Sequence, residues 1–243
     1  MPLDYGCVSA RGSALAATVV FMAVRAWWDG APSETYWMEI TDRSDLGGEL
    51  WAPKSDAIGG EMWSYTLVSY VQPGDRVFHW HKNAAGEPAL VGWSEAAGPL
   101  GSDVRAWQAR GTAGRARGAA TTGPVWVMPL KGLHKLPTPV SRSALNGQLY
   151  ESVLDALQQT QEEVGQHRPA YAPFQHYGGR ELRAQQGYLT KFPAALVAVL
   201  SLKPHRPRTP CEPTRPLVAA GARPTSATLN DVVPSKGTRW QLP

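Results

Sequence analysis

Tryptophan is concentrated in one part of this chain, and that concentration restricts the folds that the chain can adopt. Nine of the ten tryptophans lie between Trp27 and Trp126. Rigid indole rings bury a large apolar area at little entropic cost, and flat ligands such as nucleobases stack on their faces. The block is therefore either a recognition pocket or the filling of a small core, and for any one tryptophan core packing is the commoner case. Several of these rings stand beside polar residues in short runs that we expect to be strands: Tyr36-Trp37, Trp63-Ser64-Tyr65, His79-Trp80-His81 and Gly92-Trp93-Ser94.

The first half of the chain carries the alternation and the turn signals of short β-strands. Residues 35–40 form a run of β-branched and aromatic side chains. In residues 76–81, alternation places Phe78 and Trp80 on one face of a strand and His79 on the other. A turn follows at residues 82–87 and returns the chain into another strand-like run, so this region predicts a hairpin.

The second half predicts helices and then a tail. Apolar side chains recur at three- and four-residue spacing from Leu145 to Val164, which is typical of one amphipathic helix of about five turns. A shorter helix is expected from Pro193 to Leu202, because proline suits the first helical position. Residues 203–243 contain eight prolines and no periodicity, the composition of a disordered segment.

The net charge of +4 comes from that tail. Residues 203–243 hold seven Lys/Arg and two acids, whereas residues 1–202 hold seventeen Lys/Arg and eighteen acids. The expected folded part is close to neutral, so overall charge gives no argument for a phosphate-binding surface. Contacts with a phosphate backbone must come from individual basic residues, and the candidates are Arg43, Lys54, Lys82, Arg110, Arg115 and Arg117.

No motif indicates a cofactor, a metal or catalysis. The glycine-rich residues 111–118 lack the Gly-Lys-Ser/Thr ending of a phosphate loop, and no G-x-G-x-x-G follows a strand. His79 and His81 share a strand face and could contact one metal ion, but no third ligand stands at a recognisable spacing. No Ser, His and Asp set is marked by a nucleophile elbow. We therefore expect no cofactor, no bound metal and no catalytic residue in this chain.

The two cysteines, Cys7 and Cys211, form neither a disulfide framework nor a metal-ligand spacing, which favours a reducing cytoplasm. The apolar run at residues 14–24 is about half the length that crosses a bilayer, and its cleavage pattern is poor for a signal peptide. We expect a cytoplasmic protein with no membrane partner.

The order of the aromatic runs resembles a known family. Residues 36–40, Trp63-Ser64-Tyr65, Pro73-Gly74-Asp75-Arg76-Val77-Phe78 and Val91-Gly92-Trp93-Ser94 are similar in order to the EVE domain of the PUA-like superfamily, whose relatives include the YTH readers of methylated adenine. More narrowly, the chain resembles the EVE-like readers at the N-termini of bacterial modification-dependent restriction endonucleases, which carry a nuclease domain, often HNH. The resemblance covers about Ala26 to Leu202.

The resemblance implies an α+β fold, a PUA-like pseudo-barrel of about five strands flanked by helices, with a pocket that takes a flipped modified base. A flipped base needs stacking partners and polar groups aimed at its Watson–Crick edge. By matching position, the resemblance implies Trp37, Trp63 and Trp80 as cage or lid walls. It implies Ser64, Tyr65 and His79 as edge readers, with Trp93 and Ser94 as further pocket residues.

The chain departs from the family where a nuclease would follow. No HNH motif and no zinc-binding cysteines come after the reader region. The sequence thus predicts a non-catalytic module that binds modified double-stranded DNA, with 5-methylcytosine or 5-hydroxymethylcytosine as the target. The alternatives are an RNA-binding PUA-like module, an endonuclease that needs a separate nuclease subunit, and a pocket for a flat small molecule.

The expected domain organisation follows from these patterns. We expect an N-terminal extension at residues 1–25, a reader domain at residues 26–140 and a helical segment at residues 141–202 that packs on the reader or follows it. Residues 203–243 are expected to be a disordered Pro/Arg-rich tail, with a truncated or out-of-frame terminus as one explanation for its composition.

Overall fold

The computed structural model describes residues 24–56, 59–108, 120–179 and 181–205, which belong to one compact unit. Most of the expected N-terminal extension and tail, together with Arg110, Arg115 and Arg117, lie outside the described residues. The helices and strands of the described part are, in chain order, β1 (Tyr36–Ile40), β2 (Glu49–Pro53), α1 (Trp63–Thr66), the 3-10 helix η1 (Leu67–Tyr70), β3 (Arg76–Lys82), β4 (Pro88–Ala96), β5 (Gly101–Trp107), β6 (Thr121–Ser141), α3 (Arg142–Asn146), α4 (Tyr150–Val164), β7 (Phe174–His176), β8 (Leu182–Ala184), β9 (Leu189–Lys191) and α5 (Ala194–Val199).

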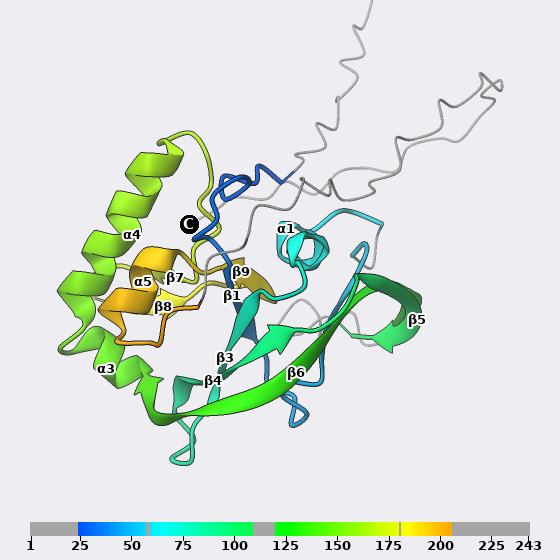
Figure 1. Cartoon of the computed structure of the whole chain (residues 1–243), viewed down its shortest axis with the longest axis horizontal. Helices are drawn as coiled ribbons and strands as arrows, with labels where there is room; N and C mark the ends of the chain where they lie inside the picture. Colours follow the sequence, from blue (N-terminus) through cyan, green and yellow to red (C-terminus); the bar gives the residue numbers. More distant parts are fainter. Residues whose placement is uncertain (1–23, 57–58, 109–119, 180, 206–243) are drawn as a thin grey trace, which may run out of the picture. The chain divides into compact units, whose positions relative to one another are not determined.

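A curled mixed sheet organises the molecule (Figure 1). Its strand order is β2-β6-β4-β3-β1-β9, and β5 also pairs with β6. Strands β1 and β3 are parallel, whereas the other pairs in this sheet are antiparallel. The long strand β6 pairs with β2 and β5 through its first part and with β4 through its second part, so it bends the sheet into a half-barrel. This confirms the predicted α+β class and is consistent with a PUA-like pseudo-barrel, with seven strands rather than about five.

Alternation along the central strands divides the core into two clusters, one on each face of the sheet. We call them the helix-side core and the inner core. The helix-side core packs β1 and β3 against α3, α4 and α5, and it includes Met38, Phe78, Trp80, Leu145, Val153, Phe192 and Leu196. The inner core packs the other face of these strands against β2, β6 and η1, and it includes Trp37, Leu50, Leu67, Val77, Met128 and Leu189. Figure 1 shows α3, α4 and α5 gathered together, with α1 apart from them beyond β1 and β3.

Residues from both sides of position 140 build the sheet. Strand β9 pairs with β1, joining Trp37 to Lys191 and Glu39 to Leu189. The ammonium group of Lys191 is buried and donates to the carbonyl oxygens of Glu34 and Tyr36. The chain after residue 141 therefore supplies an edge strand as well as helices.

Two local predictions were wrong. Trp63-Ser64-Tyr65 was expected to be a strand, but these residues open the short helix α1, in which the N–H groups of Tyr65 and Thr66 donate to the carbonyl of Met62. The single helix expected from Leu145 to Val164 is two helices, because Gly147 ends α3 in a conformation outside the helical region and α4 begins only at Tyr150. In the second case the apolar spacing was read correctly, but the break at Gly147 was not.

Candidate functional site

Helix α1 places three of the predicted pocket residues beside β9. Trp63 and Tyr65 are half-buried, and Ser64 is buried. A Cβ atom at Gly187 would lie 2.9 Å from the Ser64 Cβ and 3.2 Å from the Trp63 Cη2. The absence of a side chain at Gly187 thus lets α1 pack directly on the segment that leads into β9. The Trp63 ring also contacts the Tyr171 ring, at 5.3 Å between ring centroids.

Beneath this region, the inner core contains a chain of buried polar side chains. His79 Nδ1 lies 2.9 Å from Glu39 Oε2, and His79 Nε2 lies 2.9 Å from Ser94 Oγ. All three side chains are fully buried. A carboxylate can only accept, which assigns the Nδ1 proton to the Glu39 bond; in the neutral imidazole, Nε2 then accepts from the Ser94 hydroxyl. Buried polar groups with partners on both sides brace the neighbouring strands β1, β3 and β4.

Glu39, His79 and Ser94 are connected as in a serine–histidine–acid triad, but their surroundings do not suit catalysis. Ser94 is fully buried, and a Cβ atom at Gly47 would lie 2.6 Å from its Oγ. The segment around Gly47 therefore covers the hydroxyl. No substrate carbonyl can approach Ser94 in this conformation, so the three residues act as a structural brace.

The brace extends toward the surface through Tyr188 and Arg43. The Tyr188 hydroxyl donates to Glu39 Oε1 at 2.8 Å and accepts from the backbone N–H of Trp51 at 3.1 Å. Burial raises the pKa of Tyr188 well above its usual value, and the negative charge of Glu39 raises it further. Arg43 Nη2 donates to Glu39 Oε1 at 3.2 Å and to the carbonyl of Glu49 at 2.7 Å.

Arg43 is incompletely satisfied. Its Nε and Nη1 atoms are buried and have no hydrogen-bond partner among the described residues. The Nε atom lies 3.6 Å from Asp45 Oδ1, too far for a good hydrogen bond. The guanidinium is 5.9 Å from the centre of the half-buried Trp51 ring, and Arg105 lies 5.4 Å from the same ring. A buried donor without an acceptor costs about 1–3 kcal/mol, which a ligand that supplies the acceptor would recover.

The structure does not bring the predicted tryptophans to one cavity. Trp37 is fully buried in the inner core, where its indole N–H donates to Asp75 Oδ2 at 2.7 Å. Trp80 lies in the helix-side core, edge-on to Phe174 at 5.3 Å. Trp93 packs against the helix-side core, with the His134 ring at 4.1 Å and the Arg76 guanidinium at 3.9 Å. Of the predicted pocket residues on α1, Trp63 and Tyr65 are half-buried and Ser64 is buried, whereas His79 and Ser94 belong to the polar brace.

The predicted phosphate contacts are also dispersed. Arg43 is held by Glu39 and Glu49, as described above. Lys54 places its ammonium 4.0 Å from the centre of the Trp126 ring, and Lys82 is exposed at the end of β3. Arg110, Arg115 and Arg117 lie outside the described residues.

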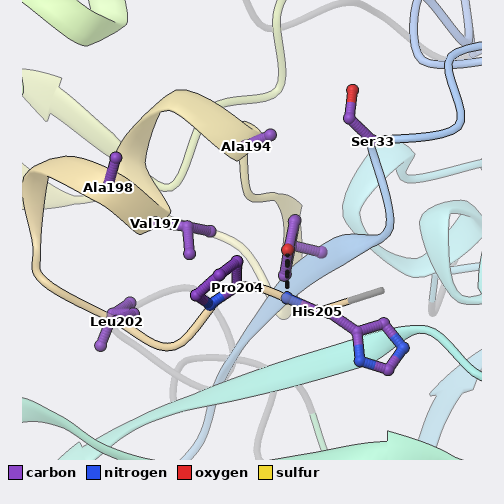
Figure 2. A pocket seen from close by; sticks show the side chains of 8 residues that line it. Ser33, Ala194, Val197, Ala198, Leu202, Pro204 and His205 are labelled. Atoms are coloured by element: carbon purple, nitrogen blue, oxygen red, sulfur yellow. Dashed lines mark hydrogen bonds between the residues drawn. The ribbon is translucent and has the colours of Figure 1, made fainter. Parts of the chain in front are cut away.

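Two cavities on the described part of the chain lie away from these residues. The larger, of about 310 Å³, is lined mainly by apolar side chains of α5 and its flanks (Figure 2). At its edge the backbone N–H of His205 donates to the Tyr36 hydroxyl at 2.7 Å, the bond dashed in Figure 2. The smaller, of about 260 Å³, is lined by Arg25, Ala26, Trp27 and Arg168.

Within the described ranges, no group of three histidine, cysteine or acidic side chains is arranged to hold a metal ion. None of the described helices has both the length and the apolar character needed to span a bilayer.

Sequence reasoning missed four members of the brace and its surroundings: Glu39, Trp51, Gly187 and Tyr188. One signal was available for Glu39, since a carboxylate in the middle of an aromatic and β-branched strand must find a buried partner. No local pattern marks Tyr188, because its partner is 149 residues away in sequence.

No protein family matches the chain, and no curated protein matches it. Solved structures similar to the chain include a structural genomics protein from Agrobacterium tumefaciens, 13% identical over 71% of this chain and 99% of that one, with a TM-score of 0.38. The N-terminal domain of McrB from Staphylothermus marinus is 13% identical over 69% of this chain and 94% of that one, with a TM-score of 0.33. ZmASCH from Zymomonas mobilis is 7% identical over 69% of this chain and 98% of that one, with a TM-score of 0.31. At these identities and TM-scores, the likenesses assign the chain to no family.

Proposed function

We propose that this protein is a nucleic-acid-binding module that takes an unstacked, modified base at the surface formed by α1, β2 and the Tyr188 segment. The proposal rests on the guanidinium of Arg43, which lies beside the ring of Trp51. Its buried Nε and Nη1 atoms have no acceptor among the described residues. The edges of nucleobases present carbonyl and ring-nitrogen acceptors that suit such a donor.

The surface formed by α1, β2 and the Tyr188 segment supplies the other parts of a base site. Trp63 is half-buried on α1 and offers an aromatic surface for stacking. The brace of Glu39, His79 and Ser94 holds the strands beneath, and Tyr188 fixes Trp51 to Glu39. Such preorganised polar groups select one ligand edge because they cannot relax around another. Because the Arg43 Nε and Nη1 atoms are buried, a base reaches them only if a neighbouring segment shifts.

The target in this proposal is duplex DNA that contains 5-methylcytosine or 5-hydroxymethylcytosine. An apolar wall favours the methylated base because it replaces water around the methyl group. The resemblance to EVE-like readers in the aromatic runs supports this choice, and in a restriction system the nuclease would be a separate subunit.

Fluorescence anisotropy tests the proposal with the full chain and three duplexes that differ only in one cytosine: plain, 5-methyl and 5-hydroxymethyl. We expect a preference of about tenfold for one modified duplex, equivalent to about 1.4 kcal/mol. An RNA of the same sequence is included, and tighter binding to it would replace DNA by RNA as the target. Equal affinity for all four probes contradicts base recognition.

Arg43→Lys sharpens this test because it keeps the charge and removes the planar fork. We expect this variant to lose the preference between duplexes while its circular dichroism spectrum stays unchanged. The matched control is Arg142→Lys, whose guanidinium is paired with Glu181 on the surface. That control should keep the preference of the wild-type protein.

A further inference from the structure

The smaller cavity lies between two chain segments that are far apart in sequence. Arg25, Ala26 and Trp27 come from the segment before β1, and Arg168 comes from the turn after α4. The indole N–H of Trp27 donates to the carbonyl of Ala170 at 2.9 Å, and this bond holds the two segments together. The cavity therefore lies where these two segments are joined.

Two arginines, Arg25 and Arg168, line this cavity, and both are exposed residues. Among the ion pairs of the described residues, none includes Arg25 or Arg168. By contrast, Arg43 and Arg105 each face carboxylates. Two like charges that share one cavity repel each other, and an anion placed between them reverses that repulsion.

A phosphate group suits a site that two arginines share. Guanidinium forks donate paired hydrogen bonds to phosphate oxygens, and two forks can hold different oxygens of the same group. The Trp27 ring beside them offers an apolar surface for the sugar or base attached to that phosphate. A nucleotide unit combines these properties.

A run of ring contacts connects this cavity to the surface around α1. Trp27 is edge-on to Trp28 at 5.7 Å, and Trp28 is edge-on to Tyr171 at 6.1 Å. Tyr171 contacts Trp63 at 5.3 Å, and its hydroxyl accepts from the backbone N–H of Arg25 at 3.4 Å. Tyr171 adopts a left-handed backbone conformation with φ of 51°, which is uncommon outside glycine and is found where packing or function requires it. The cavity and Trp63 thus flank the same tyrosine.

We propose that the cavity between Arg25, Trp27 and Arg168 is a phosphate site for the nucleic acid that the α1 surface binds. This inference rests on the proposed function. A strand that places one base at Trp63 passes its backbone along Tyr171 to the two arginines. The site contributes affinity without reading the base, because phosphates are the same in every sequence.

The salt dependence of oligonucleotide binding tests this proposal with the full chain. The double variant Arg25→Gln/Arg168→Gln should bind the preferred oligonucleotide about tenfold more weakly at low salt. Its slope of log affinity against log salt should fall by about 1, the value for one lost phosphate contact. Its preference between plain and modified bases should remain. The control, Lys131→Gln/Lys135→Gln, removes two charges from β6 and should keep the wild-type slope. A slope in the double variant equal to that of the wild type overturns the phosphate site.

A second measurement separates this site from the base site. The indole N–H resonance of Trp27, assigned with Trp27→Phe, is followed by NMR while deoxycytidine 5′-monophosphate or inorganic phosphate is added. A shift in the wild type that is absent from the double variant supports the phosphate site even if no modified base is preferred. A resonance shift with the nucleotide but not with inorganic phosphate would show that the Trp27 ring contributes to binding the sugar or base. No shift with either ligand, together with an unchanged salt slope, rejects the site.

Discussion

The hydroxyl of Tyr188 donates to the buried carboxylate of Glu39 across 2.8 Å, although 149 residues separate the two in sequence. The same hydroxyl accepts from the backbone N–H of Trp51. One side chain therefore connects strand β1 to the edge strand β2. This contact joins the N-terminal and C-terminal parts of the described chain at the proposed base site.

Tyr188→Phe removes this connection and keeps the ring. We expect the free energy of unfolding to fall by about 2 kcal/mol, because a hydrogen bond to a charged group is lost and the Trp51 N–H is left without an acceptor. Urea denaturation followed by tryptophan fluorescence measures the change. The control is Tyr177→Phe, whose side chain is exposed and should change stability by less than about 0.5 kcal/mol. Equal effects of the two substitutions would contradict the role assigned to Tyr188.

The raised pKa of Tyr188 predicts a loss of stability at alkaline pH. The folded state keeps the phenolic proton above roughly pH 10, where the tyrosine of the unfolded chain ionises. The stabilisation is thus complete below that pH and is lost as pH rises toward the folded-state pKa. We expect the free energy of unfolding to fall more steeply between about pH 10 and pH 11 in the wild type than in Tyr188→Phe. Tyr65 and Tyr70 also have raised pKa values, but they are present in both proteins and cancel in the difference. Parallel pH profiles would show that Tyr188 titrates normally.

The position of Glu39 predicts that its removal is far more damaging than the loss of a surface carboxylate. Glu39→Ala leaves Arg43, His79 and Tyr188 without their shared acceptor, and removing one partner from a buried charged network costs about 3–5 kcal/mol. Thermal denaturation compares this variant with Glu95→Ala, which breaks an exposed pair with Lys131 at 3.2 Å. The exposed pair should contribute less than about 1 kcal/mol. A small effect of Glu39→Ala would mean that the strands repack without the brace.

The sequence predicted the backbone of the central sheet well, because β1, β3 and β4 carry clear alternation and turn signals. Alternation also assigned Phe78 and Trp80 to one face and His79 to the other, as the two cores show. The pocket residues were harder to predict. Alternation shows which face of a strand a side chain lies on, but not which elements cover that face. Two tryptophans in strands can thus lie on opposite sides of the sheet, as Trp37 and Trp80 do.

Gly187 shows a second limit of sequence reasoning. Nothing in the surrounding residues indicates that this glycine meets α1, because that contact joins segments about 120 residues apart. Gly47 has a positive φ of 81°, a conformation that favours glycine, whereas the backbone of Gly187 has no such requirement. The requirement at Gly187 is space alone, which only the packed structure reveals.

Gly187→Ala therefore predicts a steric effect confined to α1. The added methyl group meets the Ser64 Cβ and the Trp63 ring, so α1 must move outward. We expect a loss of about 1–3 kcal/mol in the free energy of unfolding, typical of overpacking, and a changed near-UV circular dichroism signal from tryptophan. Gly123→Ala is the control, since a Cβ atom there meets nothing within 4 Å. If both variants behave alike, α1 is not held tightly against Gly187.

The two tryptophans at 63 and 80 separate recognition from folding. Trp63→Ala should leave the fold stable and weaken binding to the preferred oligonucleotide by about 1–3 kcal/mol, the usual contribution of a stacked base. Trp80→Ala opens a space beside Phe174 in the helix-side core and should cost about 3–5 kcal/mol of stability. Its remaining folded fraction should bind with wild-type affinity, because Trp80 faces away from α1. Anisotropy titration at a temperature where both variants are folded measures the difference. The opposite pattern, with binding lost only in Trp80→Ala, would move the base site to the other face of the sheet.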